Sequence, residues 1–434
     1  MSKEMRYSGV EWIGDIPKEW KTSLMSSLFS EHKQKNEGLK ETNLLSLSYG
    51  SIIRKDINTN EGLLPQSFES YNIIENGDIV FRLTDLQNDK RSLRTGLCRE
   101  RGIITSAYTT IRKKSDETHS RFMHYLFHSY DICKVFYGLG DGVRQGMNYG
   151  DLKKLAVVYP SFSEQQRIAN YLDKVCGEID EMVALQEKMI EELKAYKQSL
   201  ITEAVTKGLN PNATMCHSGI DWIGEIPSSW TICRIKNVAT LFGRIGFRGY
   251  TSDDLNKDGI GAITLSPSNM QPMAMDYSNV TFLSWEKYNE SPEIQIKNKD
   301  LLMVKTGSSY GKVSYVENLP REATINPQIL RIIATINSKY LGYYMQTNLF
   351  LHQVEGGVVG GTIPTISQEK ISNFLVILPS EDEQDTISSY LDSRCSEINS
   401  LIDCKKVKIE ELKEYKKSII YEYVTGKKEV PYGD

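Results

Sequence analysis

The sequence predicts an α/β (α+β) protein made of two pseudo-twofold-related globular domains that are separated by two long coiled-coil helices. Three observations lead to this prediction. One segment near the start of the chain recurs in mid-chain, a longer block also occurs twice, and that block has the apolar periodicity of a long helix. The 434 residues, 40% hydrophobic and 25% charged, suit a globular protein of two or three domains.

The first repeat is short and almost identical in its two copies. Residues 8–20 read SGVEWIGDIPKEW and residues 218–230 read SGIDWIGEIPSSW, with 8 of 13 positions identical. The second repeat joins residues 160–203 to residues 379–422, at an offset of 219 instead of 210, so the second half carries nine more residues between the shared blocks. A shared start, a divergent middle and a shared end in each half predict a monomer that mimics a twofold dimer.

The shared end predicts a helix of about 44 residues, or roughly 65 Å at ~1.5 Å per residue. Ser163 and Gln166 have the spacing of a capping box, Asp382 holds the corresponding start in the second copy, and Gly208 and Gly426 end the two helices. Spacings of four and three predict a coiled-coil seam. Its residues in the first copy are Ile168, Leu172, Val175, Ile179, Met182, Gln186, Met189, Leu193, Tyr196 and Leu200.

The divergent middles contain short β-rich runs, short helical stretches and glycine-rich polar loops, which predict compact α/β domains. The strands are expected at 80–81, 102–112, 155–159, 300–305, 329–335 and 374–378, and the short helices near 121–130 and 338–346. The boundaries predicted in this way are a first globular domain at 1–158, a central helix at 159–208, a second globular domain at 209–378, a C-terminal helix at 379–426 and a tail at 427–434.

Composition excludes several classes of protein. A net charge of -4 argues against a uniformly basic nucleic-acid binder, although residues 21–158 carry +4 and residues 231–378 carry +2. With no long apolar run and no apolar signal core at the start, we expect a cytoplasmic protein that does not bind a membrane. The seven cysteines include no Cys-x-x-Cys pair, which favours free thiols over disulfides or a zinc site.

No catalytic motif is convincing, so we expect neither catalytic residues nor a bound metal. Residues 138–142 (GLGDG) lack the helix and acidic residue that a dinucleotide or methyl-donor site needs next. Residues 307–313 (GSSYGKV) are too short for a phosphate loop. His124 and His128 are four residues apart on a predicted helix but have no third ligand, which favours surface or packed histidines.

The middles do contain side chains that suit DNA. Arginine can pair with guanine, asparagine and glutamine pair with adenine, and lysine and hydroxyl side chains contact phosphates or base edges. Each of these loops, taken alone, is consistent with an ordinary solvent-exposed loop. Similar loops recur in both halves, however, and this recurrence favours a binding role. The predicted DNA-binding residues of the first domain are Arg82, Lys90, Arg91, Arg94, Arg144, Gln145, Asn148 and Tyr149. Those of the second domain are Arg244, Arg248, Tyr250, Lys305, Thr306, Ser308, Ser309, Tyr310, Lys312, Thr362, Thr365 and Ser367.

The repeated motifs resemble the DNA-specificity (S) subunits of type I restriction–modification systems, and the resemblance covers essentially the whole chain. It rests on the SGVEWIG-IP-W start and the IEELK-x-YK-x-S block, both present twice. It rests also on the P-x-x-x-E-Q entry into each long helix, formed by Pro160, Glu164 and Gln165 and by Pro379, Glu383 and Gln384.

The resemblance implies a non-catalytic subunit with two target-recognition domains, each of which reads one half of a split, asymmetric site on double-stranded DNA. It implies that the two long helices pair antiparallel, set the spacing of the half-sites and dock two modification (M) subunits, which methylate adenine with S-adenosylmethionine. Two restriction (R) subunits would add cleavage driven by ATP and Mg. No cofactor is expected on this chain itself.

Two other functions remain open on the residues alone. A coiled-coil scaffold that organises proteins without touching DNA would explain the helices but not the recurring polar loops. A self-sufficient DNA methyltransferase would need cofactor and catalytic motifs that this sequence lacks.

Overall fold

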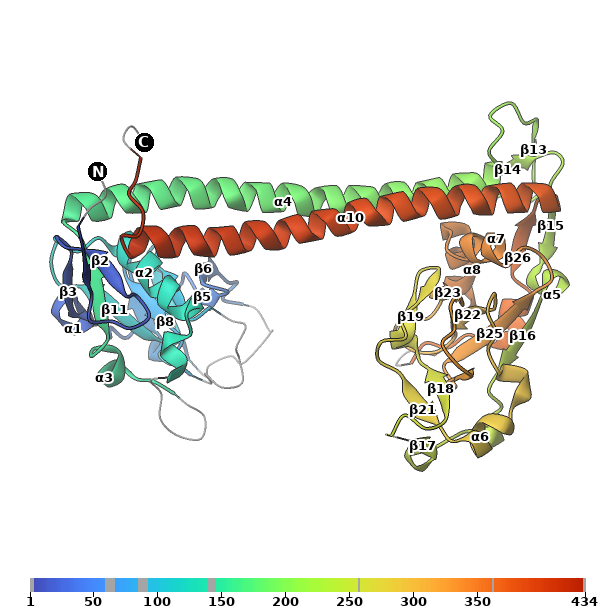
Figure 1. Cartoon of the computed structure of the whole chain (residues 1–434), viewed down its shortest axis with the longest axis horizontal. Coiled ribbons are helices and arrows are strands. Elements are labelled where there is room, and N and C mark those ends of the chain that lie inside the picture. The colour runs from blue at the N-terminus through green and yellow to red at the C-terminus, as the bar shows by residue number, and fades with distance from the viewer. Residues whose placement is uncertain are drawn as a thin grey trace. The chain divides into compact units, whose positions relative to one another are not determined.

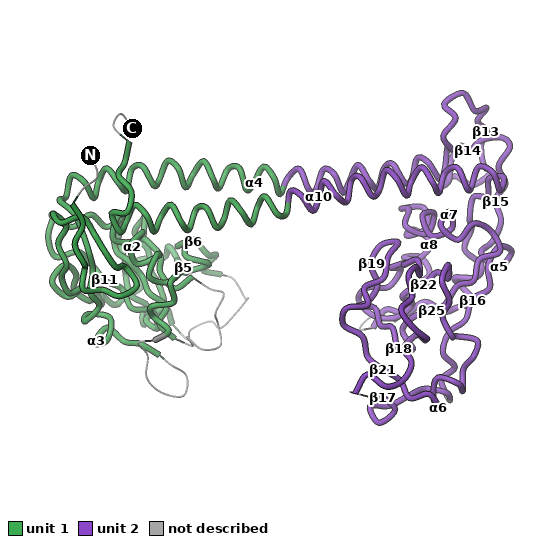
Figure 2. Tube along the Cα trace, in the orientation of Figure 1, with its two compact units in different colours: residues 1–187, 406–434 green, residues 188–405 purple. Residues whose placement is uncertain are grey.

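The computed structural model describes residues 4–58, 67–84, 93–138, 146–256, 258–360 and 363–431. The chain divides into two compact units, which Figure 2 shows in different colours. Unit 1 consists of residues 1–187 and 406–434, and unit 2 of residues 188–405. Each unit combines one globular domain with one segment of each long helix (Figure 1).

The centre of unit 1 is an antiparallel sheet with the strand order β4-β11-β8-β9. Its strands are β4 (Phe29–Glu31), β8 (Ile79–Phe81), β9 (Thr95–Leu97) and β11 (Thr109–Lys113). The sheet is flanked by the antiparallel pairs β1 (Met5–Tyr7) with β2 (Asp15–Pro17), β3 (Lys21–Leu24) with β12 (Ala156–Tyr159), β5 (Leu45–Ser48) with β6 (Ser51–Arg54), and β7 (Asn72–Ile74) with β10 (Gly102–Ile104). The helices are α1 (Met25–Leu28), α2 (Ser120–Ile132) and α3 (Tyr149–Leu152).

Unit 2 repeats this arrangement around a sheet of order β16-β25-β22-β23. Its strands are β16 (Ala239–Gly243), β22 (Leu301–Val304), β23 (Val313–Tyr315) and β25 (Ile329–Ala334). The pairs β13 (Met215–His217) with β14 (Glu225–Pro227), and β15 (Thr231–Arg234) with β26 (Leu375–Leu378), correspond to β1 with β2 and β3 with β12. The short helices are α5 (Ile235–Val238), α6 (Trp285–Asn289), α7 (Ser338–Tyr344), α8 (Asn348–Gly357) and α9 (Gln368–Ser372).

Unit 2 also has a second four-stranded sheet of order β17-β21-β18-β24, in which β18 and β24 run parallel and the other pairs antiparallel. Its strands are β17 (Leu255–Asn256), β18 (Ala262–Leu265), β21 (Thr281–Leu283) and β24 (Ala323–Ile325). The small hairpin of β19 (Met270–Gln271) and β20 (Ala274–Met275) lies in the same part of the sequence. This sheet packs around an apolar core of its own that includes Leu265 and Ile325.

The strands predicted from the sequence are present, with one difference. The run 102–112 was expected as one strand, but it forms β10 and β11 with a turn between them. The hydrogen bond from the Tyr108 amide to the Thr105 carbonyl, 3.2 Å long, closes this turn. The two short strands can therefore join different sheets, β10 pairing with β7 and β11 with β8.

The long helices are α4 (Phe162–Lys207) and α10 (Glu381–Val424). Within unit 1, Lys416 of α10 binds both carboxylate oxygens of Asp180 of α4, at 2.6 and 2.7 Å. Within unit 2, Lys197 of α4 binds the Asn399 side-chain oxygen at 2.8 Å. In each unit the early residues of one helix lie beside the late residues of the other, so the helices pair antiparallel, as expected from the family resemblance.

The predicted seam of α4 needs a correction after Ile179. Met182, Met189 and Tyr196 are exposed, whereas Val183 is half-buried and Ile190 is buried. An α-helix has 3.6 residues per turn, so a strict heptad pattern drifts around its surface by about 20° per repeat. The packed face therefore moves by one residue, and methionines that the heptad pattern placed inside face solvent.

The capping box of α10 lies two residues earlier than predicted. Ser380 precedes α10, and its hydroxyl and amide both contact the Glu383 carboxylate, at 2.8 and 3.3 Å. At the offset of 219 the corresponding residues are Ser161 and Glu164, and α4 begins at Phe162. A serine at the N-cap with glutamate three residues later satisfies two free donors at the start of the helix.

The repeated start segment packs against the end of a long helix in each unit. In unit 1, Gly426 follows α10, and a Cβ atom added to it would lie 3.3 Å from the Trp20 ring. In unit 2, Gly208 follows α4, and a Cβ atom added to it would lie 3.1 Å from the Trp230 ring. Both glycines have a positive φ, +71° and +77°, which ends the helix and lets the indole approach. No helix among the described residues is both long and apolar enough to span a bilayer.

Candidate nucleic-acid interface

The predicted DNA-binding segments of the second domain come together at the ends of β16 and β22. The Ile366 amide donates to the Lys305 carbonyl at 2.9 Å, and the Gly307 amide donates to the Pro364 carbonyl at 3.0 Å. Thr306 and Thr365 face each other in an antiparallel bridge. We call residues 243–250, 305–312, 359–360 and 363–368 the unit 2 loop cluster.

The end of β16 is fixed to the same cluster. The Gln368 amide nitrogen donates to the Leu241 carbonyl at 2.8 Å. A Cβ atom added to Gly243 would lie 3.3 Å from the Lys305 ammonium nitrogen. Three segments that are distant in the sequence thus form one surface.

Arg244, one of the predicted contact residues, is buried beneath this surface. Its guanidinium donates to the Thr324 hydroxyl at 3.0 Å and to the Ile325 carbonyl at 3.2 Å, and it lies 5.1 Å from the centre of the Tyr250 ring. Burial lowers the pKa of Arg244. Since its polar atoms are engaged inside the domain, Arg244 holds the 244–250 loop in place. Its role is therefore to position this loop.

The surface of the cluster has the composition that a polyanion requires. Lys305 and Lys312 form no ion pair with any described carboxylate, and burial lowers the pKa of Lys305. Residues 304–312 and 356–368 contain no aspartate or glutamate. Exposed or half-exposed hydroxyl side chains complete the surface, from Thr306, Ser308, Ser309, Tyr310, Thr365 and Ser367. Arg248 lies at the edge, 3.4 Å from the Glu293 carboxylate.

Two backbone contacts of this cluster recur in the first domain, where they match the bonds from the Ile366 amide to the Lys305 carbonyl and from the Val304 amide to the Lys312 carbonyl. The Met147 amide donates to the Leu83 carbonyl at 2.9 Å, and the Arg82 amide donates to the Arg94 carbonyl at 2.8 Å. Met147 corresponds to Ile366 at the offset of 219. Lys90, Arg91, Arg144 and Gln145, and Thr362 of the second domain, lie outside the described residues.

Asn148 and Ser367, both predicted contact residues, occupy equivalent N-cap positions. The Asn148 side chain accepts from the Gly150 amide at 2.6 Å before α3, and the Ser367 hydroxyl accepts from the Lys370 amide at 3.2 Å before α9. Asparagine and serine are preferred at this position because they satisfy free amides at the helix start. Both side chains are exposed, so a capping role leaves them available at the surface.

Arg94 and Tyr149 are more enclosed than the sequence suggested. Arg94 has no exposed surface, donates to the Thr84 carbonyl at 2.9 Å, and lies 5.7 Å from the centre of the Tyr137 ring. The Tyr149 hydroxyl donates to the Phe29 carbonyl at 3.3 Å. Arg94, like Arg244, therefore has a positioning role in the proposal below.

The sequence reasoning missed two pairs of residues that attach each globular domain to its long helix. The buried Gln165 donates to the Pro160 carbonyl at 3.0 Å and accepts from the His119 amide at 2.9 Å. Gln384 donates to the Pro379 carbonyl at 2.9 Å and accepts from the Asn337 amide at 3.1 Å. The repeated Glu-Gln motif was the signal, and its physical purpose is to join the helix start to α2 or α7.

An aspartate about two turns further along each long helix makes a second attachment. In unit 1, Asp173 accepts from the Tyr125 hydroxyl at 2.8 Å and binds Arg121, both on α2. The repeated Tyr-Leu-Asp sequence carries this contact, so the same attachment is expected in the other half.

Unit 2 makes the matching contact through Asp392. This carboxylate accepts from the Tyr343 hydroxyl and from the Lys339 ammonium group, both on α7 and both at 2.7 Å. The hydrogen bond to Asp392 is the main cause of a raised pKa of Lys339. Each globular domain is therefore joined to its long helix by a glutamine and an aspartate.

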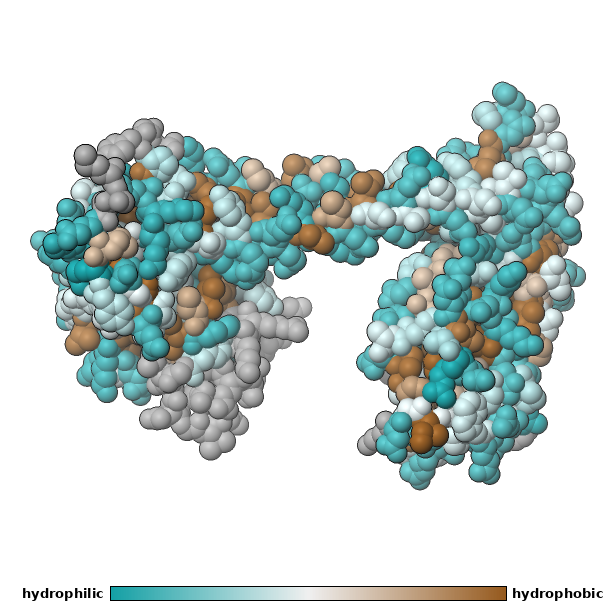
Figure 3. All heavy atoms as spheres, viewed as in Figure 1, coloured by the Kyte–Doolittle hydropathy of each residue, from teal (hydrophilic) through white to brown (hydrophobic). Residues whose placement is uncertain are grey.

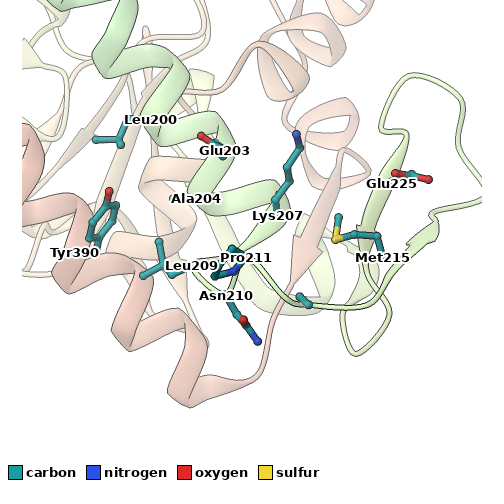
Figure 4. Close-up of a pocket in the computed structure, with 12 residues that line it drawn as sticks. Leu200, Glu203, Ala204, Lys207, Leu209, Asn210, Pro211, Met215, Glu225 and Tyr390 are labelled. Atoms are coloured by element: carbon teal, nitrogen blue, oxygen red, sulfur yellow. The ribbon is translucent and has the colours of Figure 1, made fainter.

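A cavity adjoins the attachment in each unit, and in unit 2 it has a volume of about 370 Å³ and is lined by Lys339, Tyr343 and Asp392. A second cavity of unit 2, of about 500 Å³, opens between the end of α4 and the β13–β14 hairpin (Figure 4). Tyr390 and Ala204 line it. At the offset of 219, Tyr390 corresponds to Tyr171 of unit 1 and Ala204 corresponds to Tyr423. The ring centres of Tyr171 and Tyr423 are 4.8 Å apart. Alanine thus stands in the wall of this cavity where unit 1 has a second tyrosine.

A cavity of about 620 Å³ lies beside the attachment in unit 1. His124 and His128, expected as surface or packed histidines, line it with their ring centres 6.2 Å apart. Burial lowers their pKa values to about 3 and about 4, and the charges of Lys416 and Lys417 add to the shift of His128. Among the described residues, no group of three or more His, Cys, Asp or Glu side chains is placed to hold a metal ion.

Comparison with known proteins agrees with this architecture. The family described as "Type I restriction modification DNA specificity domain" matches the chain twice, over residues 17–195 and 227–418. The two matches correspond to the two halves of the internal repeat.

Curated relatives extend over most of the chain. The type I restriction enzyme MjaVIII specificity subunit of Methanocaldococcus jannaschii is 23% identical over 337 residues, covering 76% of this chain and 75% of that protein. The putative type I restriction enzyme MjaX specificity subunit of the same organism is 22% identical, covering 98% of this chain and 97% of that protein.

Solved structures share the fold. A chain from a structure on complex assembly and conformational transition of the type I R-M system has a TM-score of 0.69 at 15% identity, over 94% of this chain and 98% of that chain. The HsdS subunit from Thermoanaerobacter tengcongensis has a TM-score of 0.50 at 15% identity, over 95% and 98%. The chain, with its two matched domains, therefore belongs to the type I restriction–modification DNA specificity family.

Proposed function

We propose that this protein is the DNA sequence-specificity subunit of a type I restriction–modification complex, and that each globular domain reads one half of a split DNA site. The observation that carries the proposal is that one backbone arrangement, a loop cluster held by equivalent hydrogen bonds, is built twice and carries different side chains. A shared scaffold with variable surface residues suits a protein whose two halves bind the same kind of polymer with different sequence preferences.

The proposed site is asymmetric because the two clusters differ at equivalent positions. Asn148 corresponds to Ser367, and Tyr149 corresponds to Gln368. An amide and a hydroxyl present different donors and acceptors to a base edge, so the preferred bases differ. Lysines and hydroxyl groups around each cluster would contact phosphates and fix the orientation of the domain on the duplex.

The long helices are proposed to set the spacing of the half-sites and to dock two modification subunits. Exposed apolar side chains on the helices support the docking role, because exposed apolar patches mark interaction sites and surface methionine and tyrosine are enriched in protein interfaces. Figure 3 shows apolar patches along the paired helices. The exposed residues are Met182, Leu185, Met189 and Tyr196 on α4, and Leu401, Val407 and Tyr415 on α10.

We further propose that this chain is not itself an enzyme and holds no cofactor. In this proposal S-adenosylmethionine binds to the modification subunits, and ATP and Mg bind to two restriction subunits of the full complex. The support is family membership together with a sequence that carries no motif for methyl transfer or for a phosphate loop.

The proposal is tested with the complex of this chain and its modification subunit, by measuring DNA affinity at several salt concentrations. Lys312→Ala should weaken binding. It should also make the affinity less dependent on salt, so that the plot of log affinity against log salt is less steep by about 1, because one phosphate contact is lost. Lys297→Ala is the matched control, since this exposed lysine precedes β22 whereas the loop cluster follows it. It should leave the affinity unchanged.

Sequence-selective binding by the complex is the decisive result. Mapping of methylated bases in DNA from cells that carry the whole system should give a split, asymmetric site. A complex that binds all sequences equally would overturn the proposal in favour of a protein scaffold, and methyl transfer by this chain alone would favour a self-sufficient methyltransferase.

A heptad added to both long helices should lengthen the spacer and leave the half-sites unchanged.

A further inference from the structure

The unit 2 loop cluster carries exposed aliphatic side chains in the middle of its polar surface. Val359 is 60% exposed and Ile363 is 63% exposed, and Ile245 of the same cluster is also exposed. Exposed aliphatic side chains are common when scattered, but here three lie within one set of hydrogen-bonded loops.

Val359 and Ile363 are held by a defined backbone. Val359 and Thr365 exchange two hydrogen bonds, of 2.9 and 3.0 Å, and Thr365 pairs on its other side with Thr306. Gly360, next to Val359, has a φ of +101°, a conformation that glycine adopts without strain. The pairing fixes the backbone at Val359 and at Thr365, two residues after Ile363.

The surroundings of these side chains suit duplex DNA. Lys305 and Lys312 lack carboxylate partners among the described residues, and the two loop segments 304–312 and 356–368 contain no acidic residue. A cationic, hydroxyl-rich surface of this kind favours phosphate. On a base edge in the major groove, the apolar group that an aliphatic side chain can contact is the C5-methyl group of thymine.

The other half of the protein has different chemistry at the matching sequence position. At the offset of 219, Ile363 corresponds to Arg144. Arginine suits the acceptors of guanine, whereas isoleucine offers no hydrogen bond and suits a methyl group. The substitution thus changes the kind of base contact that this position could make.

We propose that Val359 and Ile363 recognise thymine methyl groups in the half-site that unit 2 reads. This inference rests on the proposed function, since it requires that the loop cluster enters the major groove. It assigns to the second domain a preference for A·T pairs at the positions that these side chains contact.

The test uses the complex with its modification subunit and synthetic duplexes that carry the mapped site. Each thymine of the second half-site is replaced singly by uracil, which lacks only the methyl group. At a contacted position the substitution should weaken binding about fourfold, the equivalent of about 0.8 kcal/mol for one buried carbon group. The variant Ile363→Ala or Val359→Ala should bind the thymine and uracil duplexes about equally.

Two controls separate this inference from the proposed function. Ile260→Ala removes a side chain that is 62% exposed in unit 2 outside the cluster, and should leave the thymine–uracil difference intact. Uracil in the first half-site should affect wild type and Ile363→Ala alike. Selective binding with no dependence on any methyl group of the second half-site, or a second half-site made only of G·C pairs, would overturn the inference alone. Loss of all sequence selectivity in the wild-type complex would instead overturn the proposed function.

Discussion

The attachment of a globular domain to its long helix can be compared in the two units, because the protein builds it twice. The hydrogen bonds of Gln165 and Gln384 are the same in kind, and so are the tyrosine contacts of Asp173 and Asp392. A cavity adjoins these contacts in both units, but its lining differs, with His124 and His128 in unit 1 and Gln346 in unit 2. The comparison teaches that the attachment itself is preserved while the packing next to it is free to diverge.

The largest expected effect comes from removing the shared glutamine. Gln165→Leu and Gln384→Leu should each lower the free energy of unfolding of their unit by about 2–4 kcal/mol, because buried backbone donors and acceptors lose their partners. Hydrogen exchange of peptides from each unit would measure the loss separately. Gln166→Leu is the control, since this neighbour is exposed and should change stability by less than about 0.5 kcal/mol. A large effect in one unit and none in the other would contradict the equivalence of the attachments.

Acid should distinguish the two units by a smaller amount. In the folded protein the pKa values of His124 and His128 lie below the ordinary 6.5, so the unfolded chain takes up protons first as pH falls. The stability from these neutral rings is complete above pH 6.5 and is lost as pH falls toward about 4 and about 3. Both rings line a cavity and keep part of their surface exposed, which limits the loss. We expect unit 1 to lose about 1–2 kcal/mol by pH ~4.5 from this cause.

The second unit supplies the matched variant for that experiment. When Tyr125 is aligned with Tyr343, the positions of the two histidines hold Gly342 and Gln346, which do not titrate. The variant His128→Gln should therefore reduce the acid sensitivity of unit 1, measured as its unfolding free energy between pH ~7 and pH ~4.5. Unchanged acid sensitivity in this variant would show that other groups are responsible.

The smallest expected effect is a gain in stability. Ala204→Tyr places in unit 2 the ring that Tyr423 provides in unit 1, and a stacked pair with Tyr390 should stabilise the unit by about 0.5–1.5 kcal/mol. A thermal denaturation midpoint that rises would support this explanation of the cavity. Tyr423→Ala, the reverse change, should destabilise unit 1, and a neutral result for both would show that the cavity has another cause.

The sequence could predict the features that depend on repetition and periodicity. The two copies of residues 8–20 and 218–230 identified the halves, and the apolar spacing identified both long helices. The recurrence of similar polar loops in both halves was also visible in the sequence, although the contacts between those loops were not predicted. Physical chemistry of this kind acts over short distances along the chain and is visible in the sequence.

Other features depended on three-dimensional packing and could not be predicted. Arg94 and Arg244 looked like DNA-contacting arginines, but both are buried, and their guanidinium groups donate to the Thr84 carbonyl and to the Ile325 carbonyl. The helix seam shifted by one residue at Val183 because the true helical period differs from the heptad that the pattern suggested. The extra sheet of unit 2 also left no clear signal, because its strands are only two to four residues long.

The division of the chain into units has a consequence for the order in which the protein is made. Unit 2 is one continuous stretch, whereas the core of unit 1 includes Ile419, Tyr423, Val424 and Val430 from the last part of the sequence. The last-made helix segment also reaches the first repeat, where Lys427 donates to the carbonyls of Ile13 and Asp15, both at 2.8 Å. On the ribosome, therefore, the domain that is synthesised first is the one that is completed last, and it must wait with an unfinished core until the final helix emerges.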